Sequence, residues 1–138
     1  YRPGTLKAVA LDKSGIALGE TTLQTAGQKT RLHLAPEKTT LRADGQSLCF
    51  IPITLTDAAG IWKPCASAKV HLEIEGPAAL QALGSAATQT DETYLGSSHT
   101  TWLGRALAVI RAGTEPGKVR VTVTAEGYEP QYVDLTVE

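Results

Sequence analysis

The chain has 138 residues, which is the size of one domain or of one domain with a fragment of another. Its 13 basic and 14 acidic residues are interspersed and leave a net charge of −1, so we do not expect nucleic acid as a partner. No apolar run approaches the length of a membrane-spanning helix, so we do not expect membrane insertion either.

The N-terminal part is predicted to form a hairpin and then shorter strands. Residues 5–11 and 16–25 have strand character and are joined by a turn at residues 12–15. Alternating leucines predict another short strand at residues 32–34. A turn signal follows at Asp44-Gly45.

The stretch of residues 47–60 contains the strand around which we expect the fold to be organised. Its apolar side chains alternate at period 2, as in a half-buried strand: Cys49, Ile51, Ile53 and Leu55. Pro52 cannot donate a ladder hydrogen bond, so we expect this strand to lie at a sheet edge or to carry a bulge. Residues 69–75 offer a matching apolar face, and we predict that the two strands pair as a hairpin.

The C-terminal half is also predicted to be β-structure. Residues 80–83 have the character of a brief strand, and residues 84–102 that of a long loop. Residues 103–111 are apolar on both faces, which indicates a central strand. Valines alternate with polar residues at 119–123, and a final strand covers residues 133–137. With no helical periodicity in any segment, the sequence predicts an all-β sandwich.

An internal repeat suggests a domain boundary. Pro3-Gly4 and Pro116-Gly117 each open a strand, and a short turn and a second strand follow. The second copy is the last hairpin of the chain, so by analogy the first copy is the last hairpin of a preceding domain. We therefore predict that residues 1–27 are a hairpin remnant of a preceding accessory β domain and that residues 28–138 are the sandwich domain.

The two cysteines leave the redox compartment open. Cys49 lies on the apolar face of its strand and is expected to be a small buried hydrophobic residue. Cys65 lies in a loop, and the loop length allows a disulfide with Cys49 if the geometry permits.

The polar candidates for a catalytic or metal site are better explained as ordinary surface. Glu73 and Glu75 share one strand face, which is typical of a solvated edge. Neighbouring carboxylates, scattered histidines and a Ser-Ser-His run lack the spacing of a calcium, zinc or nucleophile site: Asp91, Glu92, His33, His71, Ser97, Ser98 and His99. We explain the last three of these by the polarity of their loop. The sequence predicts no catalytic residue, metal or cofactor.

The aromatic residues of the loops are the candidate binding residues. Trp62 follows a turn glycine, Trp102 closes the long loop, and Tyr94 lies between them in the sequence. Loop aromatics stack on sugar rings, so these three are candidate carbohydrate contacts. The alternative is that they plug the ends of the sandwich or contact a neighbouring domain.

Five segments in this order resemble a known enzyme family over nearly the whole chain. They are Pro3-Gly-Thr-Leu-Lys-Ala-Val-Ala10, Thr25-Ala-Gly27, Leu41-Arg-Ala-Asp-Gly45, Asp57-Ala-Ala-Gly60 and Gly104-Arg-Ala-Leu-Ala-Val-Ile-Arg111. Together they resemble the C-terminal region of bacterial family 2 glycoside hydrolases of the β-galactosidase type. The resemblance implies an immunoglobulin-like β-sandwich of about seven strands, preceded by the end of another accessory β domain. Residues 47–60 also look similar to invasin-type immunoglobulin-like repeats.

The resemblance also sets the expected function. Catalysis in that family belongs to two glutamates of a separate barrel domain, one of them directly preceded by asparagine, and this sequence contains no asparagine. The loop after Leu83 departs from the usual pattern of the family, so no role of that loop carries over. The expected function is a non-catalytic accessory domain that packs on sister domains of a periplasmic or extracellular glycoside hydrolase. The alternatives are a carbohydrate-binding module that contacts polysaccharide, or an adhesin-type spacer repeat.

Overall fold

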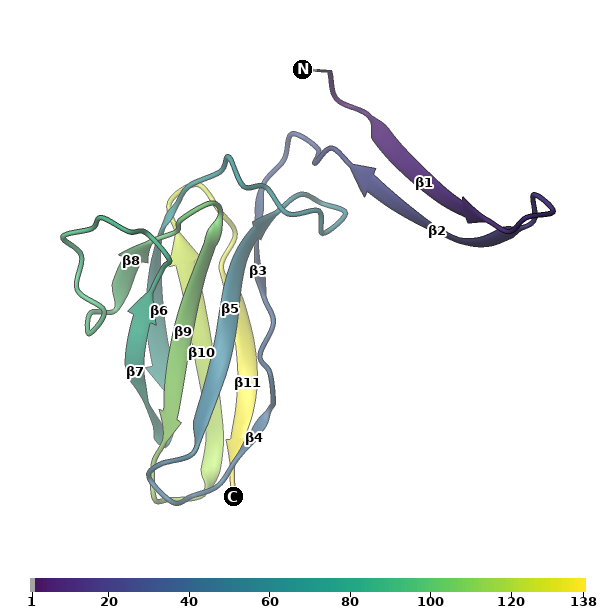
Figure 1. Cartoon of the computed structure of the whole chain (residues 1–138). Coiled ribbons are helices and arrows are strands. Elements are labelled where there is room, and N and C mark those ends of the chain that lie inside the picture. Colours follow the sequence, from purple (N-terminus) through teal and green to yellow (C-terminus); the bar gives the residue numbers. More distant parts are fainter. Residues whose placement is uncertain (1) are drawn as a thin grey trace.

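The computed structural model describes residues 2–138 and contains only β-strands and connecting segments there (Figure 1). The strands are β1 (Thr5–Leu11), β2 (Ala17–Gln24), β3 (Arg31–Leu34), β4 (Thr40–Leu41), β5 (Leu48–Thr56), β6 (Lys69–Glu75), β7 (Ala78–Gly84), β8 (Ser98–Thr100), β9 (Arg105–Ala112), β10 (Gly117–Ala125) and β11 (Gln131–Val137). Within this described part, no helix is available to cross a membrane.

Two sheets packed face to face form the body of the molecule (Figure 1). One has the strand order β4-β11-β10-β6-β8 and the other β3-β5-β9-β7. The largest fully buried side chains come from both sheets and fill the space between them: Leu41, Ile51, Ile53, Leu55, Leu83, Ile110, Leu135, His99, Val70, Val119, Val121 and Val123. The predicted immunoglobulin-like sandwich is confirmed. β4 and β8 have only two and three residues, so the longer strands of the sandwich number seven, as predicted.

The predicted N-terminal hairpin is present as a separate two-stranded sheet that projects from the sandwich (Figure 1). β1 and β2 are antiparallel, and every residue in both strands is exposed. Lys7 and Glu20 form an ion pair of 2.7 Å on one face, and Leu6 lies opposite Leu23 on the other. An isolated hairpin is marginally stable in water. That residues 1–27 end a preceding domain stays a prediction.

β5 confirms the expected burial but not the expected position in the sheet. Cys49, Ile51, Ile53 and Leu55 are all fully buried, as their alternation predicts. The strand pairs with β3 on one side and β9 on the other without a register shift, so the prediction of an edge strand or a bulge at Pro52 is wrong.

The reason is local to the end of β3. The Pro52 carbonyl accepts a hydrogen bond from the Ala35 nitrogen, so the Pro52 nitrogen also faces the β3 side. β3 ends at Leu34, one residue earlier. The missing N–H group therefore points to where the regular ladder has already stopped.

The predicted hairpin of β5 and β6 is also wrong, because the two strands belong to different sheets. Residues 57–68 cross from one sheet to the other. The apolar faces do meet, but across the core, where Ile53 and Val70 are both fully buried. Two strands can bury matching apolar faces by packing face to face in different sheets as well as by pairing side by side in one sheet.

The C-terminal end of the predicted long loop contains β8, which pairs with β6. His99 lies in β8 and is fully buried, so the explanation of His99 by loop polarity is wrong. Three residues are too few for a period-2 pattern to be visible in the sequence. The expected central position of β9 is confirmed, since it pairs with β5 and β7.

The C-terminal hairpin of β10 and β11 is confirmed, and β11 also pairs with β4 in parallel. Three hydrogen bonds fasten the chain end there: Thr136 N to Thr39 O at 2.8 Å, Glu138 N to Leu41 O at 2.9 Å, and Ala43 N to Glu138 O at 2.8 Å. The last strand is therefore attached to one of the first strands of the sandwich.

Candidate functional site

Trp62 packs under an arginine that the sequence did not single out. The guanidinium carbon of Arg105 lies 3.8 Å from the Trp62 ring centroid, which is a cation–π contact. The indole nitrogen donates a hydrogen bond to the Leu103 carbonyl at 2.8 Å. The Trp62 side chain therefore already has internal partners on both its apolar face and its polar edge.

Trp102 lies next to the same arginine through the backbone. Two backbone hydrogen bonds of 2.8 and 3.0 Å join Trp102 and Arg105. Trp102 is 47% exposed and borders a shallow hollow of about 430 Å³, whose polar lining includes Gln89, Thr90 and Asp91. The structure thus brings the two tryptophans together around Arg105.

Tyr94 is a plug over the open edge of the sandwich. Its ring stacks on His99 with 5.4 Å between centroids, and its carbonyl accepts a hydrogen bond from Leu83 N at 2.8 Å. The ring lies so close to Gly84 that any added Cβ there would collide with it. Tyr94 and Arg105 line one apolar hollow of about 510 Å³, so all three predicted aromatic residues lie near Arg105.

Glu92 fastens the segment between β7 and β8 to the sheet. Its carboxylate accepts hydrogen bonds from Thr100 N at 2.8 Å and Thr100 Oγ1 at 3.0 Å, and Lys69 Nζ lies 3.3 Å away. The backbone hydrogen bond from Thr100 is the main reason that the pKa of Glu92 is lowered. Of the acidic pair at residues 91 and 92, Glu92 therefore has a structural role, while Asp91 is exposed.

The buried His99 contacts the same carboxylate. Its Nδ1 lies 3.0 Å from the Thr100 carbonyl, which can only accept, so Nδ1 carries the proton. Glu92 Oε2 is 3.5 Å from this nitrogen. Among the described residues, His99 Nε2 and Ser85 Oγ are buried without a hydrogen-bond partner. The Tyr94 ring covers His99, so His99 has a structural role in the packing of this edge.

His33 is exposed on β3 of the four-stranded sheet, while Ser98, His71, Glu73 and Glu75 lie on the outer face of the five-stranded sheet. Ser98 Oγ and His71 Nδ1 are 2.9 Å apart, and His71 Nε2 is 3.7 Å from Glu73. The His71 and Glu73 side chains are 43% and 73% exposed. Glu75 is exposed as well, as the solvated-edge interpretation predicts. Within residues 2–138, no group of three or more potential ligands could hold a metal ion.

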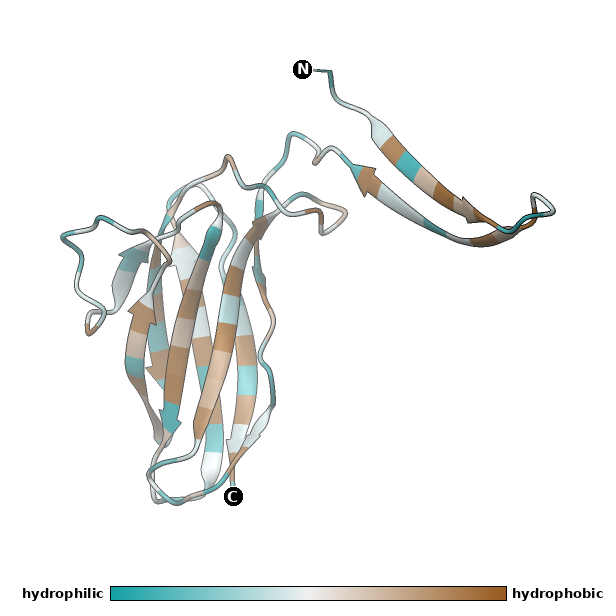
Figure 2. Ribbon diagram, viewed as in Figure 1, coloured by the Kyte–Doolittle hydropathy of each residue, from teal (hydrophilic) through white to brown (hydrophobic). Residues whose placement is uncertain are grey.

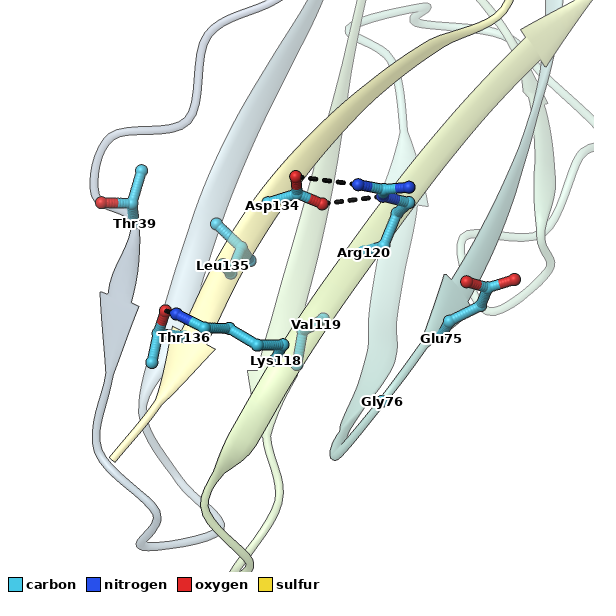
Figure 3. Close-up of a pocket in the computed structure, with 9 residues that line it drawn as sticks. All are labelled: Thr39, Glu75, Gly76, Lys118, Val119, Arg120, Asp134, Leu135 and Thr136. Atoms are coloured by element: carbon cyan, nitrogen blue, oxygen red, sulfur yellow. Dashed lines mark hydrogen bonds and ion pairs between the residues drawn. The ribbon is translucent and has the colours of Figure 1, made fainter.

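A shallow hollow of about 690 Å³ on this face is crossed by a neutralised ion pair (Figure 3). Arg120 donates to both carboxylate oxygens of Asp134, at 2.8 and 3.0 Å. The hydrogen bond from Arg120 lowers the pKa of Asp134. Lys118 donates to Thr136 at 2.9 Å, and Figure 3 shows Glu75 pointing away from the pair. Exposed cross-strand pairs of this kind contribute little to stability.

The junction between hairpin and sandwich is held by Asp57. One carboxylate oxygen accepts hydrogen bonds from Ala59 N and Ile61 N, both at 2.8 Å, and the other accepts from Gly27 N at 2.6 Å. The Gly27 bond is the largest cause of the lowered pKa of Asp57. Lys63 Nζ donates to the Gln28 carbonyl at 2.7 Å, which adds a second fastening. The sequence showed Asp57 only as a turn residue.

The cysteines are not paired. Cys49 is buried, and its sulfur lies 3.2 Å from the Lys38 carbonyl, while Cys65 is exposed. Burial of the thiol raises the pKa of Cys49, so it behaves as an inert part of the core.

Comparison with known proteins identifies the family. The model of the glycoside hydrolase family 2 C-terminal domain 5 matches residues 32–134. The chain belongs to this family. The resemblance expected from the five sequence segments is therefore confirmed.

Two relatives of this chain are much longer than the chain itself. The β-galactosidase BoGH2A of Bacteroides ovatus is 28% identical over the whole chain, which covers 16% of that protein. A family 2 glycosyl hydrolase of Bacteroides cellulosilyticus is 33% identical with a TM-score of 0.94, again over the whole chain and 18% of the relative. The chain thus spans about a sixth of the length of these relatives.

A structural likeness to an adhesin concerns the fold alone. The D00-D0 domain of intimin is 22% identical, with a TM-score of 0.58 over 97% of the chain and 64% of that structure. At this identity, the shared property is the immunoglobulin-like architecture.

Proposed function

We propose that the chain is a non-catalytic accessory domain of a β-galactosidase-type glycoside hydrolase, in which it packs on sister domains and supports them. The main support for this proposal is the hairpin of β1 and β2, whose apolar side chains are exposed: Leu6, Val9, Leu11, Ile16, Leu18 and Leu23. A two-stranded ribbon gains its stability by packing on other structure. Asp57 and Lys63 hold the adjoining linker on the sandwich, so a domain that contains this hairpin would be held beside the sandwich too.

The non-catalytic part of the proposal rests on the acidic residues. Glycoside hydrolysis needs two carboxyl groups placed on either side of the scissile bond. Here Glu92 and Asp57 are engaged by backbone N–H groups, Asp134 by Arg120, and Glu73 and Glu75 lie exposed on a sheet face. We therefore expect the isolated chain to lack glycosidase activity.

The test compares the full-length parent enzyme with a version that ends before this region. Removal of residues 1–138 should lower the thermal midpoint of the remaining enzyme, and the isolated chain should not hydrolyse an aryl β-galactoside. Hydrolysis by the isolated chain, or an unchanged thermal midpoint of the truncated enzyme, would contradict the proposal.

A second candidate function, saccharide binding, is favoured by the hollow beside Trp102. It combines an exposed aromatic ring with the polar groups of Gln89, Thr90 and Asp91, which is the chemistry that sugars need. Tryptophan fluorescence should be followed while galactosides and polysaccharides are added, with calorimetry as confirmation. Saturable binding that is lost in Trp102→Ala would establish this function. A panel without response would reject it for the saccharides tried.

We further propose that the parent enzyme works in the periplasm or outside the cell, which rests on the resemblance to bacterial β-galactosidases. Cell fractionation with an antibody against this domain tests the location. Recovery of the protein in the cytoplasmic fraction would contradict it.

A further inference from the structure

The outer faces of the two sheets differ in chemistry. On the five-stranded sheet, the outward side chains are mostly polar or charged: Lys69, His71, Glu73, Glu75, Lys118, Arg120, Thr122, Thr124, Asp134 and Thr136, with the exposed Tyr132 as the exception. On the four-stranded sheet, the outward positions at the centre are apolar: Phe50, Pro52, Ala82, Leu107 and Val109. We call these five residues, together with Tyr94, the apolar face.

Strand register makes the apolar face continuous across three strands. Phe50 lies opposite Val109, which lies opposite Ala82. In the next row, Pro52 lies opposite Leu107, which lies opposite Gly84, where the Tyr94 ring occupies the space above the glycine. The result is two adjacent rows of apolar groups. Figure 2 shows β9 coloured as hydrophobic along most of its length.

These side chains are open to solvent. Phe50 is 37% exposed, Leu107 40% and Tyr94 47%. An antiparallel sheet that faces water normally presents polar residues at such positions, as the other sheet does here. A contiguous apolar patch on a sheet marks a surface that is covered by something else.

We propose that the apolar face is covered by another domain of the same polypeptide chain. This inference rests on the proposed accessory function and assigns the docking surface for it. The partner surface should have an apolar centre, with acidic groups at the rim opposite Arg105 and Arg111, which lie at the two ends of the face on β9.

The path of the chain favours a tethered partner. The relatives are about six times as long as this chain, and the matching family is a C-terminal domain, so other domains precede it in those proteins. The preceding chain enters at β3, which pairs with β5 in the same sheet that carries the apolar face. Only six residues separate β2 from β3, and Asp57 pins this linker at Gly27. A domain that contains the hairpin is therefore held close to β3, the edge strand of this sheet.

The size of the face favours a tethered partner over a second copy. A stable interface between separate proteins usually buries about 800 Å² on each partner and involves about 20–30 residues a side. The apolar face has six residues. A partner on the same chain has an effective concentration in the millimolar range, so a smaller contact is sufficient.

Cysteine labelling tests the burial of this face directly. In a Cys65→Ser background, Leu107→Cys should react with a maleimide at least tenfold more slowly in the full-length parent than in the 138-residue chain. Tyr132→Cys is the matched control, because Tyr132 is a 61% exposed strand residue on the outer face of the other sheet. It should react at similar rates in both proteins. Mass spectrometry of the labelled peptide separates these sites from other cysteines of the parent.

A third variant separates the two proposals. Leu23→Cys on the hairpin should be protected in the parent if the accessory function is right. Protection of Leu23→Cys but equal labelling of Leu107→Cys in both proteins would overturn the docking surface and leave the accessory function in place. Protection at neither position would overturn both. Slow labelling of Leu107→Cys that depends on the concentration of the 138-residue chain would identify a second copy as the occupant and also overturn the inference.

Discussion

Asp57 joins two backbone segments that lie thirty residues apart. Its two carboxylate oxygens have separate tasks, since one closes the turn after β5 and the other holds Gly27 of the linker. Asp57 is buried, and its charge is compensated by hydrogen bonds from three backbone N–H groups. A single residue thus sets where the hairpin leaves the sandwich.

Asp57→Asn separates these tasks. The amide oxygen can still accept from Ala59 and Ile61, whereas the amide nitrogen would face the Gly27 N–H group. Hydrogen exchange measured by NMR should show faster exchange at Gly27 with Ile61 still protected. Equal acceleration at both amides would mean that the two tasks are not separable.

The same residue gives a pH dependence with a defined sign. The pKa of Asp57 is lowered in the folded state, so its contribution to stability is complete above the unfolded pKa of about 3.9 and is lost as pH falls through the lower folded value. Urea unfolding between pH 6 and pH 2.5 should therefore show a smaller loss of stability for Asp57→Asn than for the unmodified chain. Parallel losses would exclude Asp57 as a contributor.

Ile53 tests the inward face of β5. Ile53→Ala removes a fully buried side chain and should lower the free energy of unfolding by about 2–5 kcal/mol, measured by urea denaturation. Glu73→Ala on the solvated face of β6 is the control and should change it by less than about 0.5 kcal/mol. An unchanged midpoint for Ile53→Ala would mean that the inward face is assigned wrongly.

Sequence identifies residue types better than residue partners. Aromatic residues in loops stand out in a sequence, whereas Arg105, which lies near all three of them, is at the start of a strand and gives no signal of its own. The sequence predicts His99 in a polar loop, because the burial of a histidine depends on what stacks over it, here Tyr94. Whether the aromatics contact a saccharide stays a prediction.

At the scale of elements, periodicity predicts where strands are and which side chains they bury. The burial of β5, the central place of β9 and the β10–β11 hairpin were all predicted in this way. Pairing across a longer connection is not predicted, because period 2 defines the two faces of a strand but not the neighbour beside it; the two correct hairpins are joined by short turns. The misassigned hairpin of β5 and β6 follows from this, since both strands bury the faces that were expected.

The position of the segment between β7 and β8 depends on the packing of the Tyr94 ring over Gly84. Gly84→Ala would drive the added Cβ into the ring and should destabilise the chain by about 1–3 kcal/mol in urea unfolding. In a Tyr94→Ala background, the same change should cost much less, because the obstacle is gone. Gly19→Ala in β2 is the matched control, with open space around its added Cβ. An equal loss of stability from Gly84→Ala with and without the Tyr94 ring would contradict the packing of this ring over Gly84.

At the scale of the whole molecule, the hairpin and the sandwich have different means of stabilisation. β10 lies between two strands and buries three valines, whereas no residue of β1 or β2 is buried. In dilute monomeric chain, the hairpin amides should exchange with solvent at least tenfold faster than those of residues 119–123. Equal protection in hydrogen-exchange NMR would contradict the separation of the chain at residue 27.

The parallel pairing of β4 with β11 has a consequence for a chain under tension. A pull between the linker and the C-terminus draws these two strands in opposite directions along their length (Figure 1). The three backbone hydrogen bonds that join residues 39–43 to residues 136–138 are then loaded in shear, so they bear the force together and do not break one at a time. The pairing of β4 with β11 should therefore resist a force applied between the two ends of the sandwich until these hydrogen bonds break.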